Sequence, residues 1–225
     1  MTDQDRDGFS VLLTVRDMPA SVRFYRDRLG FEMGASFPNE REAMWCRMVL
    51  DEQPVMLCTA VTEDDEGESC EHASTADRAR FEQRAEDLQR HKRGVGVAIY
   101  LRVANVDEFH DELRERGVEI ASGPTNQVYE IREMTVDDPD GYELVFFTPV
   151  SLPGCQSCGV PLTDARPGQK YCPSCTSEGG ELRSYQQVFE GTVTGFFMAM
   201  HKLPRGEAEQ AAREHLRKMP AWSSF

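Results

Sequence analysis

Several features that mark other classes of protein are missing from this sequence. No apolar run approaches the roughly 20 residues that a membrane-spanning helix needs, and no signal-peptide core follows the acidic segment 1–7. No Ser-His-Asp arrangement, phosphate-binding glycine loop or nucleotide fingerprint is visible. We therefore expect a cytoplasmic protein that does not insert into membranes and has none of these three sites.

Basic side chains are also scarce. The chain has 25 Lys and Arg against 39 Asp and Glu, a formal net charge of -14 at pH 7. Residues 1–150 carry 17 basic and 32 acidic side chains (-15), whereas residues 151–225 carry 8 and 7 (+1). Binding to nucleic acid or to anionic membranes needs a concentrated basic face, so we expect neither kind of partner.

The first two-thirds of the chain contain an internal repeat of strand and helix signals. An apolar strand at 9–17 precedes a helix at 18–29, whose apolar residues recur at helical spacing before Gly30 ends it. Strands at 44–51 and 54–61 follow, around a turn at Glu52–Gln53. The pattern then returns, with a strand at 95–103, a helix at 106–117 ended by Gly117, and strands at 118–120, 128–138 and 142–149.

This repeat predicts an α+β fold built from paired βαβββ modules. The modules span about residues 8–62 and 94–150, and an acidic helical connector at 63–93 joins them. The connector is predicted to be a solvated helix, with a charged regulatory surface as the alternative.

Two segments carry a resemblance to a known family. VRDMPASVRFYRDRLGF (15–31) and DDPDGYELVFF (137–147) resemble the glyoxalase/bleomycin-resistance family, which has the vicinal oxygen chelate fold. The resemblance covers about residues 8–150 and implies a cleft enclosed by the two modules. Enzymes of this family usually hold a divalent metal there, with His and Glu ligands. The corresponding positions in this chain are Ser10, Met56, Ala98 and Val145, which cannot supply such a ligand set.

The resemblance therefore implies a metal-free protein that binds a small molecule, as bleomycin-resistance proteins do. A metal-dependent lyase, isomerase or dioxygenase is the alternative. Period-two alternation along the strands predicts an apolar and aromatic lining with few polar groups, although single aromatic residues could belong only to the core. Relatives often dimerise, which implies a homodimer. The predicted ligand-binding residues are Ser10, Trp45, Arg47, Met56, Tyr100, Arg102 and Phe147.

The seven cysteines point to a metal site. An odd number in a chain without an export signal argues against a disulfide framework. Four of them form the pattern C-x2-C-x13-C-x2-C, and two such knuckles complete a closed tetrahedral zinc site. We predict one structural zinc per chain, with a redox-active CxxC pair as the alternative. The predicted ligands are Cys155, Cys158, Cys172 and Cys175.

A second resemblance covers about residues 154–222. CQSCGVPL, YCPSCTSEGG and the tail RGEAEQAAREHLRKMPAW (205–222) resemble a zinc ribbon domain family in which two helices follow the second knuckle. It implies a ribbon at 154–179 and a helical tail at 180–225, but no activity. The apolar stripe within 184–203 is predicted to pack against the tail or the main domain, with a partner-binding or dimer surface as the alternative. A further hypothesis is an adaptor that uses the ribbon for protein contacts.

Overall fold

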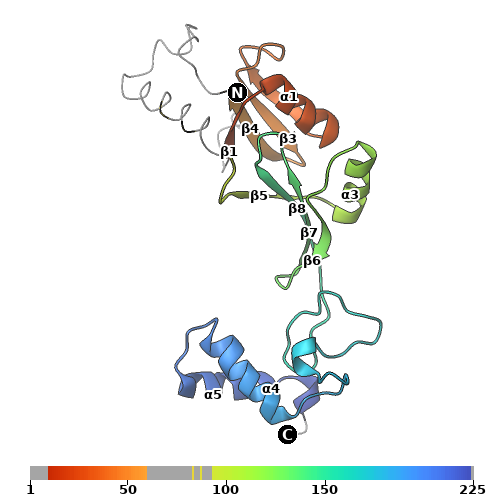
Figure 1. The fold of residues 1–225 in the computed structure, drawn as a ribbon, viewed down its shortest axis with the longest axis vertical. Coiled ribbons are helices and arrows are strands. Elements are labelled where there is room, and N and C mark those ends of the chain that lie inside the picture. The colour runs from red at the N-terminus through yellow and green to blue at the C-terminus, as the bar shows by residue number, and fades with distance from the viewer. Residues whose placement is uncertain (1–9, 60–82, 84–86, 88–92, 224–225) are drawn as a thin grey trace. The chain divides into compact units, whose positions relative to one another are not determined.

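Two four-stranded sheets form the first part of the chain (Figure 1). The computed structural model describes residues 10–59, 83, 87 and 93–223. The sheets have the strand orders β1-β4-β3-β2 and β5-β8-β7-β6. Strand β1 runs parallel to β4, and β5 runs parallel to β8. The paired βαβββ modules predicted from the sequence are confirmed. The strands are β1 (Val11–Val15), β2 (Glu32–Phe37), β3 (Trp45–Leu50), β4 (Gln53–Thr59), β5 (Ala98–Arg102), β6 (Ser122–Asn126), β7 (Ile131–Asp137) and β8 (Glu143–Pro149).

Each module carries one helix. Helix α1 (Met18–Arg23) begins at Asp17, whose side chain accepts a hydrogen bond from the amide of Ala20, and a π-helical turn at Phe24–Arg28 continues it. Helix α3 (Val106–Glu115) begins at Asn105, whose side chain caps two amides of the first turn. Gly30 and Gly117 follow the two helices with φ of 82° and 72°, a conformation that glycine adopts without strain.

One apolar core lies between the helices and the sheets of both modules. Tyr25 and Phe31 are fully buried, and their rings meet edge to face with centroids 5.2 Å apart. In the second module, the rings of Phe109 of α3 and Phe146 of β8 have centroids 4.9 Å apart. Because buried residues of both modules belong to the same cluster, the two modules stabilise each other.

The two segments that carry the family resemblance touch each other in the core. The hydroxyl of Tyr25 donates to the carboxylate of Asp138 at 3.1 Å, and the amides of Asp140 and Tyr142 donate to the same carboxylate at 2.9 Å. Burial raises the pKa of Asp138, and these hydrogen bonds oppose the increase. The first helix is thereby connected to the turn that leads into β8.

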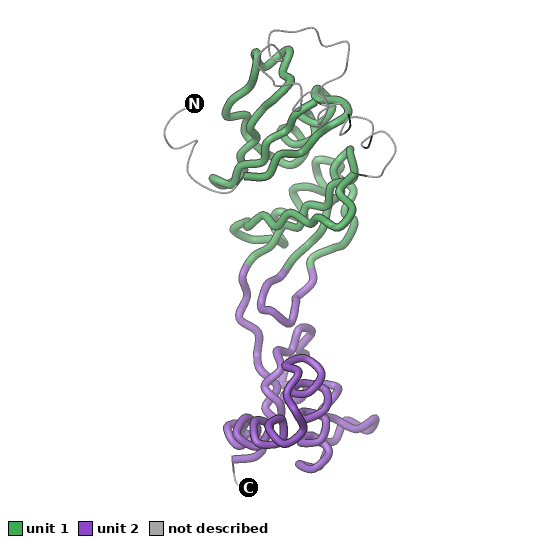
Figure 2. The backbone as a smooth tube through the Cα atoms, turned by 90° about the vertical axis from the view of Figure 1, so that its left-hand side faces the viewer, with its two compact units in different colours: residues 1–124, 133–148 green, residues 125–132, 149–225 purple. Residues whose placement is uncertain are grey.

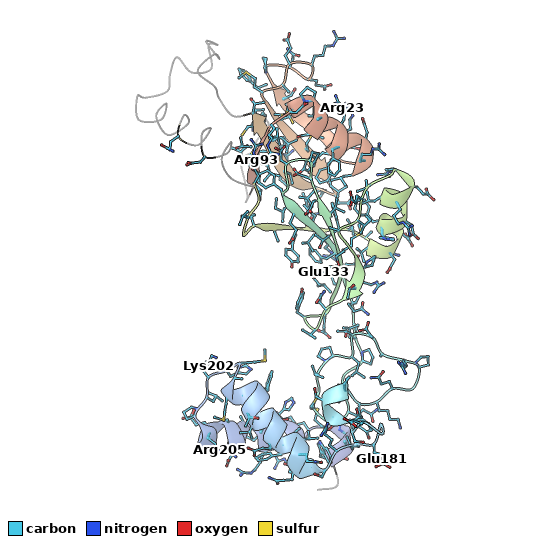
Figure 3. The ribbon with its side chains drawn as sticks, viewed as in Figure 1. Arg23, Arg93, Glu133, Glu181, Lys202 and Arg205 are labelled. Carbon is cyan, nitrogen blue, oxygen red and sulfur yellow. The ribbon has the colours of Figure 1, made fainter. Side chains whose placement is uncertain are left out.

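A buried ion pair joins the same turn to β1. Arg93, labelled in Figure 3, forms an ion pair with Asp140, and the two side chains are only 5% and 3% exposed. Arg93 also donates to the carbonyl oxygen of Thr14 at 3.0 Å, and the amide of Arg16 donates to Asp140 at 3.1 Å. Both charges have lost their water, so Arg93 depends on Asp140 for compensation, whereas Asp140 is compensated by Arg93 and by the exposed guanidinium of Arg16 at 3.8 Å.

The structure corrects details of the sequence prediction, which gave no position for β2 at Glu32–Phe37. Residues 118–120 are not a strand, and the strand at that edge of the sheet is β6 at Ser122–Asn126. Its sequence SGPTN has no strand signal, since glycine and proline disfavour strands, although an edge tolerates proline. The turn between β3 and β4 lies at Asp51–Glu52 rather than Glu52–Gln53. The predicted connector at 63–93 lies outside the described residues, except for Gln83, Asp87 and Arg93.

We predict that the double substitution Asp51→Asn and Glu52→Gly in the turn between β3 and β4 stabilises the protein. Both residues have positive φ, 45° and 65°, which is unfavourable for ordinary side chains. Asn-Gly is the preferred pair where two successive residues have positive φ. We expect a gain of about 1 kcal/mol in the free energy of unfolding, because the relief of strain exceeds the entropy cost of glycine. Urea unfolding measures this free energy. The control Asp51→Ala should give no gain in stability. A double variant less stable than the wild type would contradict the prediction.

The chain divides into two compact units (Figure 2). The first comprises residues 1–124 and 133–148, and the second comprises 125–132 and 149–225. The second unit has its own core, which contains three cysteines of the CxxC pairs beside apolar residues of two helices. The helices of the second unit are a 3-10 turn at Pro173–Cys175, α4 (Tyr185–Gly191), a π-helical turn at Thr192–Met198, α5 (Arg205–Leu216) and a 3-10 turn at Pro220–Trp222.

Among the residues that the structure describes, none of the helices has the length and apolar character needed to span a membrane.

The apolar stripe within 184–203 is partly covered by α5. Val188, Phe189 and Val193 are buried in the same core as Ala212 and Leu216. A capping box formed by Ser184 and Gln187 begins α4. Further along, Phe196 and Met200 remain 41% and 70% exposed.

Candidate ligand face and metal centre

Three of the predicted ligand-binding residues lie side by side on one face of the first sheet. Strand pairing places Arg47 beside Met56 and Trp45 beside Cys58. Residues paired in this way point to the same face. Trp45, Arg47 and Met56 are half-buried, whereas their strand neighbours on the other face are fully buried in the core. The register therefore assigns Trp45 and Arg47 to the open face, which alternation along β3 alone left undecided.

Three more lie together on the second sheet. Tyr100 is paired with Val145 and Arg102 with Phe147, so all four point to one face. The rings of Tyr100 and Phe147 meet edge to face with centroids 6.1 Å apart, and Tyr100 is 50% exposed. The seventh predicted residue, Ser10, directly precedes β1 and is exposed. The structure thus forms two groups of three, one on each sheet.

The positions that hold a metal in enzymes of the resembled family carry no donor set here. Met56 is paired with Leu12, and Val145 is paired with Tyr100 at the equivalent place in the second module. Ala98 is paired with Glu143, which is the one acidic side chain among the paired residues of β5 and β8. Within the described part of the chain, the four CxxC cysteines form the only group of three or more His, Cys, Asp or Glu with converging donor atoms.

The four cysteines of the second unit converge on one point. Their sulfur atoms all lie within 4.8 Å of one another, and those of Cys158 and Cys172 are 3.7 Å apart. A disulfide needs about 2.05 Å, and the thiols are free. Zinc–sulfur bonds of about 2.3 Å in a tetrahedron place the sulfurs about 3.8 Å apart. The donor set and its dimensions therefore fit zinc.

Local hydrogen bonds shape the two knuckles. The amide of Cys155 donates to the carbonyl of Val160, and the amide of Gly159 donates back to that of Cys155, both at 2.8 Å. Gly159 has φ of 81°, so glycine is required at this turn. Across the site, the amide of Cys172 donates to the sulfur of Cys155 at 3.3 Å. Such N–H···S bonds stabilise a thiolate.

The thiols differ in how readily they ionise. A hydrogen bond to Cys175 raises the pKa of Cys158 well above its usual range, and burial raises the pKa of Cys172 to about 11. Hydrogen bonding from Cys158 lowers the pKa of Cys175 to about 5. A metal binds the thiolate rather than the thiol, so zinc binding at this site releases protons from the thiols that are not yet ionised.

The first knuckle is also held by residues near the C-terminus that the sequence did not single out. The amide of Ala221 donates to the carbonyl of Gln156 at 2.9 Å, and the indole N–H of Trp222 donates to that of Ser157 at 2.8 Å. The ring nitrogen Nε2 of His215 lies 2.8 Å from the carbonyl oxygen of Cys158. No spacing rule connects these residues with the CxxC pair, and only the resemblance of 205–222 to the zinc ribbon family gave a hint of them.

Two family models match the chain. That of the Glyoxalase/Bleomycin resistance protein/Dioxygenase superfamily matches residues 9–146, and that of a zinc ribbon domain matches residues 154–223. No curated protein matches.

Similar solved structures include a glyoxalase/bleomycin resistance protein/dioxygenase from Nocardioides, which is 19% identical, with 73% of this chain and 89% of that chain covered and a TM-score of 0.46. TioX from Micromonospora sp. ML1 is 17% identical, with 64% and 99% covered and a TM-score of 0.45. UcmS2 is 21% identical, with 63% and 98% covered and a TM-score of 0.46.

Proposed function

Because the chain belongs to the glyoxalase/bleomycin resistance protein/dioxygenase superfamily, we propose that its first unit binds a small aromatic molecule without a bound metal. The observation that carries the proposal is the composition of the open sheet faces. Each presents an aromatic side chain that is not fully buried beside an arginine, with Trp45 near Arg47 on one sheet and Tyr100 near Arg102 on the other. Binding serves either to sequester the molecule or to sense it.

The chemistry of these faces suggests which molecules fit. Aromatic rings favour a planar partner through stacked and edge-to-face contacts. Guanidinium groups favour carboxylate or carbonyl oxygens and also stack on rings. We therefore expect a planar aromatic ligand with a carboxylate or carbonyl substituent.

Quenching of the fluorescence of Trp45, obtained as the part of the tryptophan emission that Trp45→Phe removes because Trp222 also emits, tests the proposal. A panel of planar aromatic carboxylates and aromatic antibiotics should include compounds that quench it saturably and raise the melting temperature. Arg47→Met should weaken binding about tenfold, the value of one charge-assisted hydrogen bond. Arg26→Met removes an exposed arginine of the first helix and serves as the matched control.

Two results would contradict the proposal. One is a panel that leaves both Trp45 emission and the melting temperature unchanged. The other is a second metal ion, such as Ni, Fe or Mn, that copurifies with the first unit, because that would favour the lyase, isomerase or dioxygenase alternative.

For the second unit we propose one structural zinc per chain, held by the four cysteines. The convergence of the sulfur atoms supports this assignment. Zinc thiolates require reduced cysteines, so we also propose that the protein acts in the cytoplasm. Proteins of this superfamily often form dimers, and we propose a homodimer, which light scattering can test. The exposed Phe196 and Met200 leave room for a protein partner on the second unit.

A further inference from the structure

We propose that His215, Ala221 and Trp222 form a C-terminal clamp that holds the first knuckle in its metal-binding conformation. Zinc binding and docking of the C-terminal segment 205–222 then stabilise each other. The inference rests on the zinc site proposed above and extends it to residues distant in the sequence. It assigns these three residues a positioning role, since none of them is a zinc ligand.

The clamp acts on three successive peptide groups. The carbonyls of Gln156, Ser157 and Cys158 accept hydrogen bonds from Ala221, Trp222 and His215, at 2.9, 2.8 and 2.8 Å. The first two of these peptides lie between the two cysteines of the CxxC pair and the third directly follows Cys158, so their orientation helps to set the directions of both sulfur atoms. Trp222 is only 4% exposed, so its hydrogen bond is sheltered from water.

The C-terminal segment lies directly against the knuckle. A Cβ atom at Gly159 would come within 3.2 Å of the sulfur of Met219 and 3.4 Å of Nε2 of His215. Gly159 also has a positive φ, so both the turn and the close approach require glycine there.

The cysteines and the segment share one core. Cys155, Cys172 and Cys175 are buried in the same cluster as Leu216 and Trp222. The ring of Tyr185 on α4 lies edge-on to Trp222 with centroids 5.4 Å apart. If the knuckle rearranged without zinc, the contacts that bury the C-terminal segment 205–222 would therefore be disturbed.

Thermodynamic linkage makes the effect reciprocal. If the clamp favours the metal-binding conformation, it raises zinc affinity by the same factor by which zinc favours docking. Hydrogen-bond partners of metal ligands typically change metal affinity by 10–100-fold. A segment that served only as apolar cover would lose stability when its hydrogen bonds were removed, but would not alter zinc affinity in this way.

Zinc affinity of the full chain, measured by competition with a chromophoric chelator, tests the clamp. We expect Trp222→Phe, which keeps an aromatic ring but lacks the N–H, and His215→Leu to weaken zinc binding by 10–100-fold. His215→Gln retains a side-chain N–H donor and should recover most of the affinity. Arg217→Ala changes an exposed side chain of the same segment and should bind zinc as the wild type does.

A second readout follows the indole N–H resonance of Trp222, assigned from its loss in Trp222→Phe. Removal of zinc should shift this resonance and speed its exchange with water. Variants that bind zinc as tightly as the wild type, with a resonance insensitive to metal removal, would overturn the clamp and leave the zinc site intact. A wild-type chain that binds no zinc would overturn both.

Discussion

Replacing Cys175 by serine is expected to unfold the second compact unit and to leave the first unit folded. The substitution removes one of the four converging sulfur atoms and so breaks the tetrahedral donor set. Zinc binding supplies about 10–16 kcal/mol in small domains of this kind, and the cysteines belong to the unit's own core. We expect no bound zinc, rapid proteolysis within 149–223 and loss of one of two unfolding transitions.

Cys58→Ser is the matched control for this experiment. Cys58 is a free cysteine of the first sheet, outside the cluster, and its replacement should leave the zinc content and both transitions unchanged. Treatment of the wild type with a strong chelator should reproduce the effect of Cys175→Ser. A Cys175→Ser chain that resists proteolysis like the wild type would show that the unit folds without the metal.

The metal site illustrates what spacing can and cannot predict. The two CxxC pairs are local patterns, and part of their knuckle geometry comes from backbone hydrogen bonds to residues in or directly after each pair. The clamp residues contact the knuckle through hydrogen bonds to main-chain carbonyls, which every residue possesses. Nothing in the sequence of the first knuckle therefore indicates that His215 or Trp222 will bind there.

The fold of the first unit was predictable because its signal is repeated. Two successive sets of strand and helix patterns, each with a glycine after its helix, specify the βαβββ modules. Strand β6 escaped prediction because an edge strand needs few apolar residues. Arg93 escaped prediction for a different reason. It ends a highly charged segment, where a solvated side chain is the natural expectation, and its burial depends on Asp140, far along the chain.

The arrangement of side chains on the candidate ligand face was predictable in part. Alternation correctly grouped Tyr100 with Arg102, and Trp45 with Arg47. It could not decide which face of β3 meets the core, because apolar residues occupy both faces, as Trp45 and Met48 show. Only pairing with β4, whose Val55 and Leu57 are fully buried, decides it.

Replacing Arg93 by methionine is expected to destabilise the first unit by about 3–5 kcal/mol, the usual effect of removing one partner of a buried ion pair. Asp140 would keep only the exposed guanidinium of Arg16, 3.8 Å away, as a charged partner, and the carbonyl of Thr14 would lose a donor. Methionine keeps much of the apolar length of arginine, so lost side-chain volume contributes little to the change. Urea unfolding followed by circular dichroism measures the free energy of unfolding.

The double variant Arg93→Met with Asp140→Asn separates the ion pair from other effects. Asparagine is neutral, yet its carbonyl oxygen can still accept from the amide of Arg16. It should therefore be more stable than Arg93→Met alone, because the buried charge that has lost its buried partner is removed, and a double-mutant cycle gives the coupling. Arg26→Met breaks an exposed pair with Asp27 and should not change stability measurably. If Arg93→Met had the same free energy of unfolding as the wild type, the association of the two modules would depend on their apolar contacts and on the hydrogen bond between Tyr25 and Asp138 instead.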